Sequence, residues 1–303
     1  MWKYVLKRLL LAALTVFIII TFTFFAMNAI PGGPFDSEKA PSPDVKAVLE
    51  ARHNLDKPLV EQYVLYLGDL LHGDFGVSLK TGRDISTTIS ESFGISAKLG
   101  LMAAGVALFF GLIFGSIAAL MRNKWPDRVI IFSTTLFVSV PSFVLATLLL
   151  LVFCLKLQWF PVWSTTSQNY LLPVISLALY PMSYITRLTK TSMLDVMGQD
   201  YIRTAKAKGV SRFFVIAKHA LRNALIPVIT YVGPMTAYII TGSMVVETVF
   251  TIGGLGTKFV SSIINRDYSM IMATTIFLSV LMVLATLISD LLYKAVDPRI
   301  KFE

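Results

Sequence analysis

The chain carries little charge and almost no cysteine. Of its 303 residues, 15% are charged and 55% are hydrophobic, and the net charge is +9. Soluble domains carry roughly 25% charged residues, so this composition excludes the soluble, disordered and collagen-like classes. The single cysteine, Cys154, cannot form a disulfide within the chain, which excludes a secreted scaffold held together by disulfides.

The motifs of several chemistries are also missing. The sequence contains no Gly-x-x-x-x-Gly-Lys-Ser/Thr loop, so we expect that this chain does not bind and split ATP itself. His53 and His72 have no neighbouring cysteine or ligand set, and we interpret them as surface residues rather than metal ligands. Because no cluster combines a nucleophile with a base, we expect neither an enzyme nor a cofactor in this chain.

Long stretches without Lys, Arg, Asp or Glu predict helices that cross a membrane. They cover residues 9–30, 99–121, 129–155, 171–186, 224–246 and 269–289. About 20 residues of helix span the hydrocarbon core, so five stretches fit, and the fourth fits if Arg187 reaches the membrane surface. The first stretch is not followed by an Ala-x-Ala pattern, which favours an uncleaved helix over a signal peptide.

The distribution of charge predicts which loops face the cytoplasm. Residues 187–223 carry eight positive and two negative charges, whereas residues 31–95 carry six positive and ten negative charges. Because basic loops face the cytoplasm, residues 187–223 and both termini are expected inside and residues 31–95 outside. The same rule explains the positive charge without a nucleic-acid ligand. The predicted fold is a single all-α integral membrane domain over residues 1–303 with six transmembrane helices.

Two outer segments are too polar to span the membrane. Residues 31–95 predict a small external subdomain, with helices over 44–53, 58–71 and 85–93. Residues 247–268 predict a short amphipathic helix on the outer side. We interpret Arg266 and Asp267 in this segment as a local ion pair at the surface.

Residues 187–223 predict a helix, a tight turn and a second helix. Residues 201–208 favour a helix, and Gly209 suits the left-handed position after its last turn. Ser211 is placed to cap the next helix, which leads into the fifth span. Two interpretations stay open: a hairpin lying at the lipid headgroups, or a docking surface for a cytoplasmic partner.

Small residues and prolines recur inside the predicted spans. Every fourth residue of the second span is small: Ala103, Ala107, Gly111, Gly115 and Ala119. Such a stripe favours close packing inside the bundle over a subunit interface. Prolines are expected to face the interior or a cavity, because each frees a backbone carbonyl. They are Pro141, Pro181, Pro227 and Pro234.

The cytoplasmic segment resembles a known loop. Arg203-Thr-Ala-Lys-Ala-Lys-Gly209, followed by His219-Ala-Leu-Arg-Asn-Ala-Leu-Ile-Pro227, is similar to the EAA loop in the membrane subunits of binding-protein-dependent ABC importers. The Glu and first Ala of the general pattern are Arg203 and Thr204 here. Similarity to the B-type permeases of oligopeptide importers extends along the chain, through residues 7–8, 30–35, 73–76, 96–100, 141–143, 241–248, 265–268 and 297–298.

This resemblance implies a type I importer fold in the bacterial inner membrane and a set of partners. They are a second homologous permease, two cytoplasmic ATPase subunits that bind ATP and Mg, and a periplasmic or lipid-anchored peptide-binding protein. The implied substrates are oligopeptides, with dipeptides, murein or antimicrobial peptides and nickel chelates as alternatives. An ion-coupled secondary carrier is the alternative from another class.

The resemblance also implies which residues carry the function. The EAA hairpin over 187–223 would couple to the ATPases through Arg203, Thr204, Ala205, Lys208, Gly209, Val210 and Leu221. A peptide route tolerant of side chains needs hydroxyl groups near helix kinks rather than fixed charges. The candidates are Ser139, Pro141, Ser142, Thr241 and Ser243. The alternative is that these hydroxyls bond back to their own helices.

Overall fold

The computed structural model describes residues 2–30, 33, 35, 42–52 and 54–296. The regular secondary structure in this part of the chain is helical apart from one isolated bridge between Val77 and Asp84, so the predicted all-α fold is confirmed. The α-helices are α1 (Trp2–Asn28), α2 (Pro43–Arg52), α3 (Leu59–Leu71), α4 (Ile85–Leu120), α5 (Trp125–Ser139), α6 (Ser142–Leu149), α7 (Leu171–Met197), α8 (Asp200–Ala207), α9 (Arg212–Phe214), α10 (Arg222–Ile240), α11 (Met244–Val249), α12 (Leu255–Ile264) and α13 (Tyr268–Val296). Two π-helical segments, Leu150–Lys156 and Val215–Leu221, follow α6 and α9.

Five of the predicted spans lie on long helices, and the sixth is broken. Within the described ranges, five helices are long and apolar enough to cross a membrane. The predicted span over 129–155 consists instead of Trp125–Ser139 and Ser142–Lys156, which are bent by 103°. Pro141 explains the break, because its ring pushes Val140 to an extended conformation with φ −86° and ψ 126°.

The described residues group into two compact units. The first comprises the described residues within 2–94 and 257–283, and the second comprises residues 95–256 and 284–296. In the first unit, the ring of Phe24 on α1 stacks on Tyr66 of α3 with centroids 5.7 Å apart. Thr21 and Tyr63 join the same two helices by a hydrogen bond of 2.6 Å between their hydroxyls. Side chains of α3 therefore hold it against the C-terminal part of α1.

The first unit contains the outer helices expected from the sequence. Helices α2 and α3 match the predicted ranges, although His53 lies outside the described residues. The expected surface pair of Arg266 and Asp267 is wrong, because the side chain of Asp267 is buried. Its carboxylate accepts hydrogen bonds from the Ser78 hydroxyl and from the Leu79 N–H at 3.2 Å. Asp267 thus fixes the loop before α4 to the start of α13.

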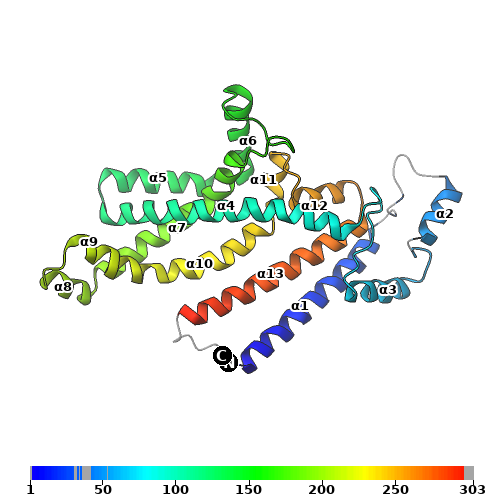
Figure 1. Ribbon diagram of the computed structural model, residues 1–303, viewed down its shortest axis with the longest axis horizontal. Helices are drawn as coiled ribbons and strands as arrows, with labels where there is room; N and C mark the ends of the chain where they lie inside the picture. The colour runs from blue at the N-terminus through cyan, green and yellow to red at the C-terminus, as the bar shows by residue number, and fades with distance from the viewer. Residues whose placement is uncertain (1, 31–32, 34, 36–41, 53, 297–303) are drawn as a thin grey trace. The chain divides into compact units, whose positions relative to one another are not determined.

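The second unit is organised around α7. This helix packs against α5, α6 and α10 (Figure 1). Its contact with α4 is close because a Cβ on Gly115 would meet the Thr186 carbonyl oxygen at 2.6 Å, and one on Gly111 would meet Ile185 at 2.7 Å. All members of the small-residue stripe are buried, so the prediction of packing inside the bundle is confirmed.

Polar contacts join α5 and α7 near one end. Lys190 on α7 forms an ion pair with Asp127 in the first turn of α5, and Asp127 is 5% exposed. Arg187 donates to the Thr135 hydroxyl of α5 at 2.7 Å. Helix α7 is long enough to span the membrane without Arg187, and the reach of Arg187 toward the membrane surface stays a prediction.

The prolines differ in their surroundings. Pro181 is buried inside α7, as expected. Pro227 and Pro234 are exposed on this chain, because the buried face of α10 is formed by residues that include Ala224 and Val228. Pro141, at the break between α5 and α6, is also exposed.

Candidate functional site

Helix α8 has one buried face and one exposed face. Ile202 is fully buried and Ala205 is 9% exposed, whereas Arg203 and Thr204 point outward. Arg203 lies 3.5 Å from Asp200, but both side chains are largely exposed, so this pair contributes little. The face that carries Arg203 and Thr204 is available to another molecule.

The turn after α8 closes by backbone hydrogen bonds. Gly209 has φ +75°, which confirms the predicted left-handed position. Its N–H donates to the Lys206 carbonyl at 3.0 Å, and the Val210 N–H donates to the Ala205 carbonyl at 3.2 Å. These two bonds form a Schellman motif, which satisfies carbonyls that the helix end would leave free. A Cβ on Gly209 would meet nothing within 4 Å, so glycine is favoured here by conformation and not by space.

The second helix of the hairpin begins differently from the prediction. Ser211 stands at the N-cap position, but its side chain makes no capping hydrogen bond. Its carbonyl accepts from the Val215 N–H at 3.0 Å instead. From Val215 to Leu221 the chain is π-helical before it continues into α10. Such wide turns are rare and often occur at functional sites.

The hairpin has a small core of its own. Its buried residues are Ile202, Ala205, Val215 and Ala220, with Val196, Met197 and Val210 packed against them. A second cluster joins Ile216 and Leu221 to Ala119 of α4, Met193 of α7 and Ala224 of α10. Because packed side chains link the hairpin to three helices, a push on the hairpin is transmitted to them.

The structure separates the predicted coupling residues into two groups. Arg203, Thr204, Lys208 and Gly209 are exposed, whereas Ala205, Val210 and Leu221 belong to the buried clusters. The exposed group can contact a partner directly, and the buried group shapes the hairpin.

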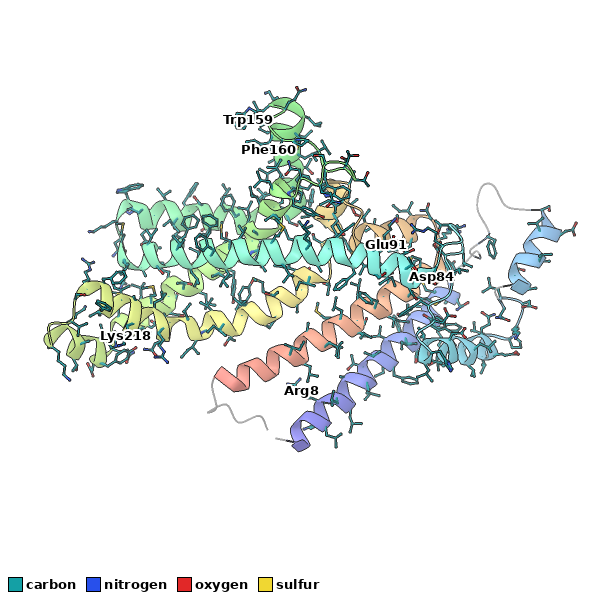
Figure 2. The ribbon with its side chains drawn as sticks, in the orientation of Figure 1. Arg8, Asp84, Glu91, Trp159, Phe160 and Lys218 are labelled. Atoms are coloured by element: carbon teal, nitrogen blue, oxygen red, sulfur yellow. The ribbon has the colours of Figure 1, made fainter. Side chains whose placement is uncertain are left out.

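Exposed aromatic side chains on the hairpin were not singled out from the sequence. Phe213 is 74% exposed, Phe214 is 58% exposed and Tyr201 is 43% exposed. Consecutive residues of a helix point about 100° apart, so two adjacent Phe residues do not both fit on a narrow buried face. The Phe-Phe pair in the sequence was therefore a signal that at least one ring faces outward. Lys218, which Figure 2 labels, lies in the π-helical segment that follows Phe213 and Phe214.

The predicted pathway residues lie at two helix breaks. Ser139 ends α5 and Ser142 begins α6, and both are exposed. Thr241 and Ser243 lie between α10 and α11, where Gly242 has φ +100°. Helices α6 and α11, which follow these breaks, pack against each other.

Two of the four hydroxyls are used locally. Thr241 donates to the Tyr238 carbonyl at 2.6 Å, and Ser243 accepts from the Val246 N–H at 3.1 Å as the N-cap of α11. Ser139 and Ser142 are therefore the better placed candidates. Within the part of the chain that the structure describes, no group of three or more His, Cys, Asp or Glu residues could hold a metal ion.

These features define a polytopic helical membrane protein with a rigid hairpin joined to its bundle. A family model described as "Binding-protein-dependent transport system inner membrane component" matches residues 111–302, and the corresponding N-terminal model matches residues 1–99. The chain belongs to this family of ABC importer permeases, and the resemblance inferred from the EAA segment is confirmed. Membership also implies association with a further permease, ATPase subunits and a substrate-binding protein.

Full-length relatives have closely similar sequences. The dipeptide transport system permease protein DppB of Bacillus subtilis (strain 168) is 46% identical, covering 99% of this chain and 98% of the relative. The oligopeptide transport system permease proteins OppB of Haemophilus influenzae and Salmonella typhimurium are 45% and 43% identical, and each match covers both chains completely.

A solved structure shows the same fold at low sequence identity. The crystal structure of an amino acid ABC transporter with histidines matches with a TM-score of 0.56 and 13% identity. The match covers 69% of this chain and 94% of that chain.

Proposed function

We propose that this permease carries oligopeptides inward across the bacterial inner membrane. The support is the full-length similarity to permeases named for oligopeptide transport, at 45% and 43% identity. Dipeptides are the second candidate, because the relative from Bacillus subtilis is named for dipeptide transport. In the proposed assembly, a second homologous permease completes the pathway, two ATPases bind ATP and Mg, and an outer binding protein delivers the peptide. Both termini lie in the cytoplasm, as the charge distribution supports.

The observation that carries the mechanism is the rigid hairpin with the Gly209 turn. We place the turn formed by Lys208, Gly209 and Val210 in a cleft of a cytoplasmic ATPase. When the two ATPases close around nucleotide, each hairpin moves with its subunit, and the clusters beneath it carry the movement to α4, α7 and α10. Energy enters because the closed ATPase pair binds ATP more tightly than the open pair, which shifts the permease between outward and inward states.

Substitution of Gly209 tests this mechanism. Gly209→Val places a β-branched residue at φ +75°, which costs about 1–2 kcal/mol and distorts the turn. Peptide uptake and peptide-stimulated ATP hydrolysis by the assembled complex should fall, while membrane insertion stays normal. Gly209→Asn is the matched control, because Asn tolerates the left-handed region, and it should retain most of the activity. Unchanged uptake by Gly209→Val would refute the assignment.

We further propose that peptides pass the breaks at Ser139, Pro141, Ser142, Thr241 and Ser243. Cysteine substitutions at the four hydroxyl positions can be probed with a membrane-impermeant thiol reagent in each nucleotide state. Cys154 is the only native cysteine and is buried, so its replacement by Ala gives a clean background. Labelling that depends on nucleotide is expected at Ser139 and Ser142. Absence of labelling in every state would remove these residues from the route.

A further inference from the structure

A buried carboxylate lies at the start of the segment that follows the fifth span. Glu247, on α11, has an exposed fraction of 0%. One carboxylate oxygen, Oε1, accepts from the Ser96 hydroxyl of α4 at 2.8 Å, and the other, Oε2, accepts from the Gly256 N–H at 2.9 Å. Charged groups are seldom fully buried without such partners, so this arrangement needs an explanation.

Ser96 and Glu247 form a hydrogen-bond network that caps the start of α12. The Leu255 N–H donates to the Ser96 hydroxyl oxygen at 2.8 Å, and Leu255 and Gly256 are the first two residues of α12. The first N–H groups of a helix have no carbonyl partner within the helix, and an acceptor side chain just before the helix commonly satisfies them. Here the preceding residues are Gly253 and Gly254, which have no side chains. The acceptors come instead from α4 and α11, and the Glu247 carboxylate also suits the positive end of the helix dipole.

The neighbouring glycines differ in the space around them. A Cβ on Gly254 would lie 2.4 Å from Glu247 Oε2 and 2.5 Å from Ser96 Oγ. A Cβ on Gly256 would lie 2.9 Å from the backbone of Met244. On Gly253 the nearest atom would be Cη2 of Trp163 at 3.9 Å, which is an ordinary contact. Glycine is therefore required at 254 by the approach of the capping groups and at 256 by the Met244 backbone, but it is not required at 253.

All the groups of this network belong to the second unit. Ser96 is the second residue of that unit after the chain enters it at Ile95, and Gly256 is the last residue before the chain leaves it. The network thus secures the chain at both positions, and it joins α4, α11 and the beginning of α12 within a single cluster of hydrogen bonds.

We propose that Ser96 and Glu247 are positioning residues that hold the start of α12 in place during transport. The proposal rests on the proposed function for its consequence: α12 follows the fifth span on the outer side, where the peptide enters. With the cap in place, Leu255 and Gly256 move together with Ser96 and Glu247 when the ATPases drive the bundle. When the cap is lost, the movement of the bundle is transferred only in part to the outer entrance. More ATP is then hydrolysed for each peptide taken up.

The first test measures the cap directly. Glu247→Gln keeps the shape of the side chain but replaces one carboxylate oxygen with an NH2 group. When the amide oxygen accepts from one partner, the NH2 group faces the other partner and cannot accept its hydrogen bond. In the complete complex in nanodiscs, the amides of Leu255 and Gly256 should exchange with deuterium about tenfold faster or more, because a charge-assisted hydrogen bond is lost. Exchange in α7 should not change. Unchanged exchange at the start of α12 would overturn the proposal.

The second test compares two adjacent glycines. Gly254→Ala should displace the capping groups and raise the ATP hydrolysed per peptide severalfold, whereas Gly253→Ala should leave this ratio near the wild-type value. The ratio is measured per assembled complex, so a loss of folded protein alone does not move it. Equal effects of the two variants, or a wild-type ratio for Glu247→Gln, would refute the positioning role. If the wild-type complex takes up no peptide, the proposed function fails, while the exchange experiment still tests the cap.

Discussion

Two glycine-containing turns of this chain are closed in opposite ways. The turn at Gly209 is closed by backbone groups within six residues, from Ala205 to Val210, and it has open space around its glycine. The turn at Gly254 is closed by Ser96 and Glu247, and Ser96 is 159 residues before its partner Leu255. The shape of the first turn depends only on hydrogen bonds between residues close in the sequence. The second keeps its shape only while three segments stay together.

The starts of two helices show the same contrast. At the start of α4, the Asp84 carboxylate accepts from the N–H of Thr87, three residues later, at 2.7 Å. In the first turn of α5, Asp127 accepts from the Asn123 N–H at 2.9 Å but also pairs with Lys190, 63 residues away on α7. If contacts between residues far apart in the sequence hold the bundle together, breaking them should cost the most stability. Breaking contacts between residues close in the sequence, which we call local closures, should cost the least.

The largest effect is expected for Lys190→Met. Removal of the cation leaves the Asp127 carboxylate, whose side chain is 7% exposed, without its charge partner. Breaking a buried pair from one side typically costs about 3–5 kcal/mol. The thermal unfolding temperature of the purified permease in nanodiscs should fall by several degrees. The double variant Asp127→Asn/Lys190→Met should recover part of the loss, because it removes the stranded charge.

An exposed ion pair provides the control for this prediction. Arg83 lies 3.2 Å from Glu91, and both side chains are more than half exposed. Glu91 is labelled in Figure 2. Such pairs contribute about 0–1 kcal/mol, so Arg83→Met should leave the unfolding temperature almost unchanged. Equal destabilisation by Arg83→Met and Lys190→Met would contradict the distinction between distant and local closure.

An intermediate effect is expected where α4 and α7 approach closely. In Gly115→Ala, the added methyl group meets the Thr186 carbonyl oxygen and the Thr189 Cβ, each at 2.6 Å. Overpacking of this kind costs about 1–3 kcal/mol. Gly105→Ala on the same helix is the matched variant, because its methyl group would meet nothing within 4 Å. It should be neutral or gain up to about 1 kcal/mol of helix propensity. A thermal shift of the same size in both variants would show that packing against α7 is not the cause.

The features that could be predicted from the sequence are those with a local signature. The outer helices, the spans on α1, α4, α7 and α13, and the left-handed Gly209 follow from hydrophobic runs and turn residues. The small-residue stripe on α4 also has a fixed period, so its burial was foreseeable. The exposed part of the coupling hairpin followed from its resemblance to the EAA loop.

The features that could not be predicted depend on contacts between distant residues. Nothing near Asp267 indicates that Ser78 will donate to it, and the adjacent Arg266 suggested a surface pair instead. Glu247 follows an apolar span with no sign that Ser96, 151 residues earlier, will meet it. The direction of the bend at Pro141 is equally set by the packing of α6 on α7 and α11. The nearby sequence predicts that a helix breaks or that a charged residue is present, but the packing of distant segments determines which groups contact it.

The smallest effect is expected at the locally closed start of α4. The hydrogen bond from the Thr87 N–H holds the pKa of the exposed Asp84 carboxyl below its usual value. Its contribution to stability is therefore complete above the unfolded-state pKa of about 4, and it is lost as the pH falls through the lower folded-state pKa. Deuterium exchange at the Thr87 amide, corrected for the intrinsic rate, should accelerate over this acidic range while exchange in α7 stays slow. Asp84→Asn still caps the helix but does not titrate, so its Thr87 amide should show no such acceleration. If the two proteins respond to acid alike, the N-cap carboxylate is not what protects the start of α4, and the local closure must be assigned to the backbone alone.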